Sequence, residues 1–477
     1  MIQRRRFKIL MQHSYVKLSI LWLLIMMVFS YGHQREMDNQ IVLSRLDLLH
    51  ALVFEKTCAI DVYENNTLDK AFYQGHYYCD KAPGSVFISF FPFLVCSEVL
   101  ANFAIPPNSR QAWFCSDWVT VASSISAISA LGAVCLFLWL NGFMPSRMSL
   151  LCTLVMAFGS SMLPYATMML SHGLVVGLLG MALFVVKLGW NEQEGFVEAR
   201  SLVGRDFLGG IACGLAIASE FDAALVAGGI LAVAFVASIR RGYGMMLGAT
   251  LPLLLIPLYN WLCFGNPFSL SYGHEAVFNQ MDNGFYGIHF PNTDNALHLL
   301  VSPERGLLFW TPFLILAYPG FFLLFDKSRP VCWLCFFIPL IQILIMSGYY
   351  TITAGSTLGA RFLVPVLPLL ILPAGMAASK VRWLAAPLAF YSITSMTAAT
   401  FVDVKLPFGE SNPLFNYYLP ELLKGHFTLT LGEVVGLRPP WSILPLLVVV
   451  LPCLAYLWWQ TGKPVGPEEN KHLTHGN

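Results

Sequence analysis

The feature that most limits this chain is a series of apolar runs, each close to twenty residues long, that recurs from one end of the sequence to the other. The 477 residues are 56% hydrophobic and only 12% charged, whereas a soluble domain has roughly 25% charged residues. Runs of this length match the hydrocarbon core of a bilayer, which a chain crosses as a helix. The sequence therefore predicts an all-α polytopic membrane protein and excludes a water-soluble one.

The charge of the chain is nearly balanced, with a formal net charge of +1. No basic cluster occurs beyond the first few residues, so the electrostatic footprint of a nucleic-acid-binding protein is missing and lipids or small molecules are the expected partners. The basic start precedes an apolar run at 16–31, and no small-residue cleavage site follows it. This pattern is typical of an uncleaved membrane anchor.

The positive charges fix the expected topology, because connectors rich in Lys and Arg stay on the cytoplasmic side. These residues lie in the N-terminus and in six connectors marked by Arg147, Arg200 and Arg205, Arg240 and Arg241, Lys327 and Arg329, Lys380 and Arg382, and Lys463. About twelve spans satisfy this rule, near 16–31, 116–140, 147–164, 172–190, two within 206–238, 244–262, 305–325, 330–347, 361–378, 382–400 and 441–459. We expect the chain to lie in a bacterial plasma (inner) membrane with both of its termini in the cytoplasm.

Two cytoplasmic connectors that follow each other in the sequence must be separated by an even number of membrane crossings. This rule decides the assignment of two uncertain apolar runs. If the apolar run 85–103 also spanned, Arg147 and every later basic connector would lie outside, so we expect a helix in or near the membrane interface. The stretch 206–238 must be two helices that turn at 219–222, with Glu220 and Asp222 facing outward. The alternative is that 85–103 spans and another run does not.

On this topology the chain forms one membrane domain, 1–477, whose long polar segments all face outward. They are the loops 33–84, 264–304, 349–360 and 401–440, while a short tail at 460–477 is cytoplasmic. Chemistry at the outer membrane surface is therefore expected.

The first outer loop holds the densest group of polar residues directly after a span. The apolar spacing of Ile41, Leu46, Leu49 and Val53 predicts a helix that starts near Asp38. A solvated loop with no catalytic role would have a similar composition. Two cysteines of this loop, Cys58 and Cys79, could pair if the loop faces an oxidising compartment.

The order of features in this loop resembles the GT-C superfamily of membrane glycosyltransferases. An acidic residue after the first span, an amphipathic helix, the segment GHYYCDKAPG and an apolar interfacial helix are similar to the lipid A aminoarabinose transferases, the protein O-mannosyltransferases and, most closely, the bacterial phospholipid-carrier-dependent glycosyltransferases. Further similar pieces are ASEFDAA, SPERGLLFWTP and GSTLGARFLVPVLP. One departure is His172, which stands where many relatives carry a second acidic residue.

The resemblance implies a function and a set of site residues. The chain is expected to move a sugar, with inversion, from a polyprenyl-phosphate donor to a lipid, polysaccharide or protein acceptor on the non-cytoplasmic face. Asp38 is the expected catalytic base, since a carboxylate can take the proton of an acceptor hydroxyl, and His172 is the second catalytic candidate. Cations stabilise a leaving phosphate, and the candidates are Lys81, Arg305, Arg361 and Arg45.

Each of these residues also has a purely structural interpretation. Arg305 and Arg361 could reach to the headgroup region from span ends, Lys81 could pair with Asp80 within the loop, and His172 could be a hydrogen-bonded residue at a helix end. His76 and Asp80, four positions apart, could bind a divalent metal ion if that segment were helical; Pro83 argues against a long helix there.

Two other classes of function share the predicted architecture. A transporter or flippase for lipid-linked saccharides would concentrate charges near the bilayer midplane, but here the ionisable residues gather in the outer loops. An assembly subunit that keeps the fold without activity is the third interpretation.

Overall fold

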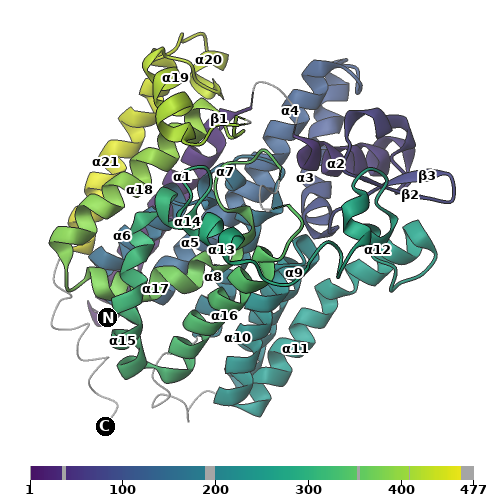
Figure 1. Ribbon diagram of the computed structural model, residues 1–477. Coiled ribbons are helices and arrows are strands. Elements are labelled where there is room, and N and C mark those ends of the chain that lie inside the picture. The colour runs from purple at the N-terminus through teal and green to yellow at the C-terminus, as the bar shows by residue number, and fades with distance from the viewer. Residues whose placement is uncertain (1, 35–38, 188–198, 352–354, 408, 463–477) are drawn as a thin grey trace.

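The chain folds into long helices that run side by side, with a group of shorter elements at one end (Figure 1). The computed structural model describes residues 2–34, 39–187, 199–351, 355–407 and 409–462. The longer helices are α1 (Ile2–Tyr31), α3 (Gly84–Asn102), α4 (Arg110–Val121), α5 (Ala127–Leu140), α6 (Ser146–Phe158), α8 (Ser171–Val185), α9 (Ala199–Ser219), α10 (Ala223–Ala237), α11 (Ile239–Leu253), α12 (Leu255–Phe264), α15 (Ala317–Lys327), α16 (Arg329–Ser347), α17 (Leu367–Ala378), α18 (Arg382–Val402) and α21 (Leu444–Thr461).

Short helices connect or cap these long ones. They are α2 (Gln40–His50), α7 (Met162–Ala166), α13 (Thr293–Val301), α14 (Leu307–Trp310), α19 (Leu419–Leu423) and α20 (Leu431–Val434). Strands in the described residues form only two small antiparallel pairs, β1 (Gly32–His33) with β4 (Leu429–Thr430), and β2 (Lys70–Tyr73) with β3 (His76–Cys79). The predicted all-α polytopic architecture is confirmed.

Among the described residues, seven helices or continuous helical stretches are long and apolar enough to cross a membrane. They are Gly84–Asn102, Arg110–Leu140, Ile239–Phe264, Arg329–Ser347, Arg361–Ala378, Arg382–Val402 and Trp441–Thr461, and four shorter apolar helices accompany them. The helix that the charge rule assigns to the interface, α3, has a sufficient length and composition to span. The number of twelve spans stays a prediction.

The helix boundaries confirm one prediction from charge and correct another. α9 ends at Ser219 and α10 begins at Ala223, so the stretch 206–238 is indeed two helices with Glu220 and Asp222 in the turn. The span predicted near 305–325 is not one continuous α-helix. α14 ends at Trp310 and a short 3₁₀ turn separates it from α15, because Pro312 has no N–H to continue the α-helix.

Small residues let the central helices approach closely. A Cβ atom on Gly132 of α5 would lie 2.1 Å from the Cα of Gly177 on α8, and one on Gly320 of α15 would lie 1.9 Å from the carbonyl oxygen of Pro373 on α17. Such contacts replace the hydrophobic driving force that helices lack inside a lipid bilayer. They fix the relative positions of the helices on which the outer loops rest.

The described residues of the loop that follows α1 fold against one end of the helices. The side chain of Asn39 caps α2 by accepting hydrogen bonds from the backbone N–H groups of Ile41 and Val42, at 3.2 and 3.3 Å. The predicted helix in this loop is therefore confirmed. In Figure 1, α2 and the β2–β3 hairpin lie at the same end of the molecule as α12.

Candidate functional site

The β2–β3 hairpin delivers Asp80 and Lys81 to a fixed position. Lys70 pairs with Cys79 at the end of the hairpin, so Asp80 follows directly, and Pro83 precedes α3. The hydroxyl of Ser271 donates a 2.6 Å hydrogen bond to the backbone carbonyl of Asp80. This bond ties the hairpin to the loop that follows α12.

A pocket of about 360 Å³ opens beside these residues. It is bounded by the first loop, by the loop after α12, and by the segments on both sides of 352–354. Its lining residues are Asn39, Gln40, Ile41, Asp69, Asp80, Lys81, Tyr272, Glu275, Phe278, Gln280, Met281, Tyr349, Tyr350, Thr351, Gly355, Ser356, Thr357 and Arg361. Two of the four predicted phosphate ligands, Lys81 and Arg361, therefore meet in one pocket.

Lys81 is held in the pocket by two carboxylates. Its Nζ atom contacts the carboxylate of Asp80 and lies 3.5 Å from Oδ2 of Asp69. Burial alone would lower the pKa of Lys81, but the charges of Asp69 and Asp80 raise that pKa well above its usual value. The ammonium group is thus positively charged and fixed in place at neutral pH.

Glu275 adds a further carboxyl group to the same wall. Burial, and then the neighbouring charge of Asp80, raise the pKa of Glu275 to about 9. The pKa of Asp80 is also raised, mainly by burial. Two neighbouring carboxyl groups cannot both ionise cheaply, so Glu275 is protonated at neutral pH.

Arg361 reaches the pocket from a different part of the chain, at the start of the 3₁₀ turn before α17. Arg305 does not line the pocket and is 4% exposed. Its Nε atom is 3.1 Å from Oε1 of Glu304, and its Nη1 atom donates a 2.6 Å hydrogen bond to the carbonyl oxygen of Gly355. Since Gly355 lines the pocket, Arg305 supports the pocket wall instead of lining it.

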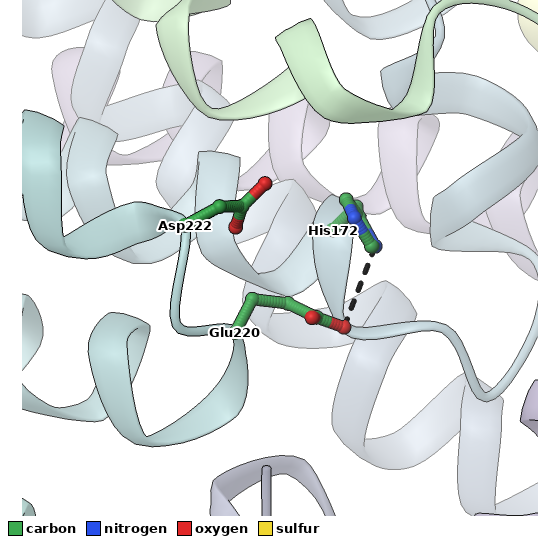
Figure 2. A group of neighbouring side chains, drawn as sticks. All are labelled: His172, Glu220 and Asp222. Atoms are coloured by element: carbon green, nitrogen blue, oxygen red, sulfur yellow. Dashed lines mark ion pairs between the residues drawn. The ribbon is translucent and has the colours of Figure 1, made fainter. Parts of the chain in front are cut away.

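Figure 2 shows a second group of polar side chains, in which His172, Glu220 and Asp222 point toward a common space. Their nearest ligand atoms all lie within 4.8 Å of one another, which is a spacing that could hold a metal ion. His172 is 3% exposed, and its Nδ1 atom is 3.5 Å from Oε1 of Glu220. None of the three residues lines the pocket.

The side chain of Arg45 already supplies a positive charge to this second group. The Nη2 atom of Arg45, which is fully buried, donates a 2.6 Å hydrogen bond to Oε1 of Glu220. Burial, and then the charge of Glu220, raise the pKa of Asp222 to about 8. The guanidinium of Arg45 therefore compensates Glu220, while Asp222 is mostly neutral.

Two predicted site residues remain, Asp38 and His76. Asp38 lies outside the described residues, although Asn39, which follows it in the sequence, lines the pocket. His76 is on strand β3 and pairs with Asp61, its Nδ1 atom 2.6 Å from Oδ2 of that residue. The segment is extended and not helical, so four positions from His76 to Asp80 span about 13 Å. These two residues have different partners and do not form the metal pair considered from the sequence.

Several pocket residues were missed by the sequence reasoning. Glu275 and the aromatic side chains of Tyr272, Tyr349 and Tyr350 line the pocket, and none was singled out. The only signal for them was their place in two outer loops, 264–304 and 349–360. Loop residues give no periodicity from which to infer a direction.

Comparison with known proteins gives a result at the level of fold. The sequence matches no protein-family model and no curated protein. Two solved structures of ArnT from Cupriavidus metallidurans are similar to this chain. The apo form has a TM-score of 0.53 at 12% identity, over 94% of this chain and 76% of ArnT. The form bound to undecaprenyl phosphate has a TM-score of 0.51 at 13% identity, over 94% of this chain and 75% of ArnT.

ArnT is an aminoarabinose transferase with the GT-C architecture. The chain has a GT-C fold. The GT-C fold accounts for the resemblance seen in the first loop, and it places this chain among multi-pass membrane proteins. At 12–13% identity the likeness establishes the fold and leaves the reaction to be argued from the pocket.

Proposed function

We propose that this protein is an inverting glycosyltransferase that takes a sugar from a polyprenyl-phosphate donor and transfers it to an acceptor hydroxyl on the non-cytoplasmic face. The observation that carries the proposal is the meeting of Lys81 and Arg361 in one pocket. The two residues come from distant parts of the sequence, and both are cations suited to a phosphate. The undecaprenyl phosphate bound by ArnT, which has the same fold, supports this class of donor.

The two cations of the lining, Lys81 and Arg361, balance the carboxylates of Asp69 and Asp80, so the pocket is close to neutral before a donor binds. Asp69 and Asp80 are both in contact with Lys81, and Glu275 is neutral at pH 7 because its pKa is about 9. Arg361 then adds a second positive charge to the lining. A donor phosphate that binds here would gain hydrogen bonds from two cations in a site shielded from bulk water, where such bonds are strongest.

The proposed reaction needs one base and no covalent intermediate. The acceptor hydroxyl gives its proton to the carboxylate of Asp38, and its oxygen attacks the anomeric carbon of the sugar. The bond between that carbon and the phosphate oxygen breaks, and the polyprenyl phosphate leaves with the electron pair. The new glycosidic bond forms on the opposite face, so the configuration inverts. Lys81 and Arg361 stabilise the charge that develops on the leaving phosphate.

The shape of the pocket also suits a sugar. Tyr272, Tyr349 and Tyr350 supply aromatic walls, while Asp69 and Gln280 supply polar groups on the same lining. Most of the lining side chains are polar or charged, and these groups can offer hydrogen bonds to the hydroxyls of a sugar. We further propose that the acceptor is a lipid, a polysaccharide or a protein at the outer surface of a plasma membrane, with both termini of this chain in the cytoplasm.

The test compares donor binding and transfer in the full-length protein. Purified protein in nanodiscs is titrated with undecaprenyl phosphate, first for the wild type and then for Lys81→Met, which keeps the side-chain length and removes the charge. Lys56→Met is the matched control, since Lys56 is an exposed cation of the same loop outside the pocket. We expect Lys81→Met to weaken binding about 10-fold or more and Lys56→Met to bind as the wild type does.

The reaction itself is tested in cells. Envelope glycans and polyprenyl-phosphate sugars are compared by mass spectrometry between cells with the wild type, without the chain, and with Asp38→Asn. Loss of one glycan together with a build-up of its lipid-linked sugar in the last two is expected. Equal binding by Lys81→Met and the wild type, or full transfer by Asp38→Asn, would overturn the proposal.

A further inference from the structure

Two cysteines that are about 200 positions apart in the sequence lie against each other in the fold. Cys58 belongs to the first loop, a few residues after α2 and its π-helical extension Ala51–Glu55. Cys263 is in the last turn of α12. The two thiols are neighbours in the fold, and both are free in the structure.

The backbone beside Cys58 is fixed by the hairpin. Ala59 forms an antiparallel bridge with Tyr78, and the N–H of Ile60 donates a 2.8 Å hydrogen bond to the carbonyl oxygen of Tyr77. The segment after Cys58 therefore runs alongside β3. Its position does not depend on the contact between the two thiols.

The backbone beside Cys263 is fixed against the same hairpin from the other side. The ring of Phe264 packs against that of Tyr78, with 5.4 Å between the centroids. The hydroxyl of Tyr259 donates a 2.8 Å hydrogen bond to the carbonyl oxygen of Cys79. Both sulfur-bearing segments are thus held by contacts of their own, and these contacts bring the thiols together.

The first loop contains one other cysteine, Cys79, and it has a different partner. Cys79 is buried, and the hydroxyl of Ser44 donates a 3.2 Å hydrogen bond to its sulfur. Cys58 is half-buried, whereas Cys263 is 4% exposed. Cys58 is therefore the thiol that an oxidant can reach, and Cys263 is placed to resolve the intermediate.

We propose that Cys58 and Cys263 form a disulfide that clamps the first outer loop to the end of α12. The oxidant is a disulfide-carrying thiol oxidoreductase of the outer compartment. The thiolate of Cys58 attacks the disulfide of the oxidant and forms a mixed disulfide with it. The thiolate of Cys263 then attacks the sulfur of Cys58, so the oxidant leaves as a dithiol that has gained two electrons and the two protons of the cysteines.

The clamp would act on the candidate pocket. Strand β3 ends at Cys79 and leads directly into Asp80 and Lys81, so a covalent link beside β3 limits how far these residues can move from α12. A cross-link over so long a loop also removes much conformational freedom from the unfolded chain. We expect the oxidised protein to unfold at a higher temperature than the reduced one.

The experiment uses the full-length protein purified from membranes without reductant. The denatured protein is alkylated with N-ethylmaleimide, digested and analysed by mass spectrometry. A peptide pair joined through Cys58 and Cys263, lost after reduction, is the expected result. Maleimide on both cysteines, or a link from Cys58 to Cys79, would overturn the proposal.

Thermal unfolding gives a second readout, in which the wild type is compared with itself before and after reduction. Reduction should lower the unfolding midpoint of the wild type by several degrees and should not change that of Cys58→Ser. Cys135→Ser, a substitution in α5 away from this contact, should behave as the wild type does. An unfolding midpoint of the wild type that does not respond to reduction would contradict the clamp.

This inference rests on the outward placement of the first loop in the proposed function, and the two can fail separately. A membrane-impermeant maleimide applied to intact cells reports the side on which the Cys58 of Cys263→Ser lies. If Cys58 is labelled from outside and yet both wild-type cysteines are free thiols, the disulfide is wrong while the topology stands. If undecaprenyl phosphate binds regardless of Lys81 while the cross-link is present, the proposed donor site is wrong and the clamp stands.

Discussion

The Nη2 atom of Arg45 lies 2.6 Å from Oε1 of Glu220, and this ion pair joins helix α2 of the first loop to the turn between α9 and α10. Arg45 is fully buried, and the Glu220 side chain is 13% exposed. A buried charge is tolerated only when an opposite charge or several hydrogen bonds compensate it. The pair therefore fixes where the first loop sits on the helices.

Glu220→Gln should destabilise the protein strongly because it leaves the Arg45 charge uncompensated. The expected loss is about 3–5 kcal/mol, measured as a lower unfolding midpoint in nanodiscs. Glu421→Gln is the control, since Glu421 pairs with Lys424 on the surface. Adding Arg45→Met to Glu220→Gln should recover much of the loss. A Glu220→Gln protein as stable as the wild type would show that the pair does not hold the loop.

Arg361→Lys should weaken the binding of undecaprenyl phosphate even though it conserves the charge. A guanidinium can donate two parallel hydrogen bonds to a phosphate, whereas an ammonium acts as a point charge. We expect about a 10-fold increase in Kd, measured by titration in nanodiscs. Arg438→Lys, on an exposed segment outside the pocket, should leave the Kd unchanged. Equal affinity of Arg361→Lys and the wild type would remove Arg361 from the donor site.

Glu275→Gln should make stability less sensitive to pH. The pKa of Glu275 is raised from 4.5 to about 9 in the fold, mainly by burial and then by Asp80, so the folded state binds more protons than the unfolded state between these values. Below about pH 4.5 Glu275 is protonated in both the folded and the unfolded state, so its contribution to folding stability is fully present. This contribution is lost as the pH rises toward 9. The variant should therefore unfold at a higher temperature than the wild type at pH 8, and the two should converge near pH 4.5.

Gly132→Ala should disturb the contact between α5 and α8. The added methyl group would lie 2.1 Å from the backbone of Gly177, so the helices must separate, at a cost of about 1–3 kcal/mol. Gly228→Ala on α10 is the matched control, because a Cβ there meets no atom within 4 Å. An unfolding midpoint of Gly132→Ala equal to that of Gly228→Ala would show that the two helices can move apart freely.

Much of the architecture follows from the order of apolar runs and charges. The turn at Glu220 and the helix capped by Asn39 were both predictable, because each has a local signal in charge or spacing. The break at Pro312 also had a signal, but the apolar run on both sides of it hid the end of α14. Local spacing and charge therefore predict where most helices begin and end. A proline can end a helix even where the residues on both sides of it are apolar.

The site was less predictable, because its contacts join distant segments. Glu220 could be read only as a polar tip, since nothing near it in the sequence shows that Arg45 is its partner. Glu275 carries no local signal, because its altered pKa arises from its burial in the fold and then from the charge of Asp80 across the pocket. Lys81 and Arg361 could be assigned separately to span ends, whereas their meeting in one pocket depends on how the helices pack.

The distance in sequence between Lys81 and Arg361 has a consequence for biosynthesis. Ribosomes make the first loop early, and the segment with Arg361 emerges only after most of the helices have been inserted. During that interval the loop must rely on contacts available by then, which are the hairpin, the Arg45–Glu220 pair and the packing of Tyr78 on Phe264. The pocket is therefore completed last, and a chain cut short before Arg361 would insert its earlier helices without acquiring a complete site for the phosphate.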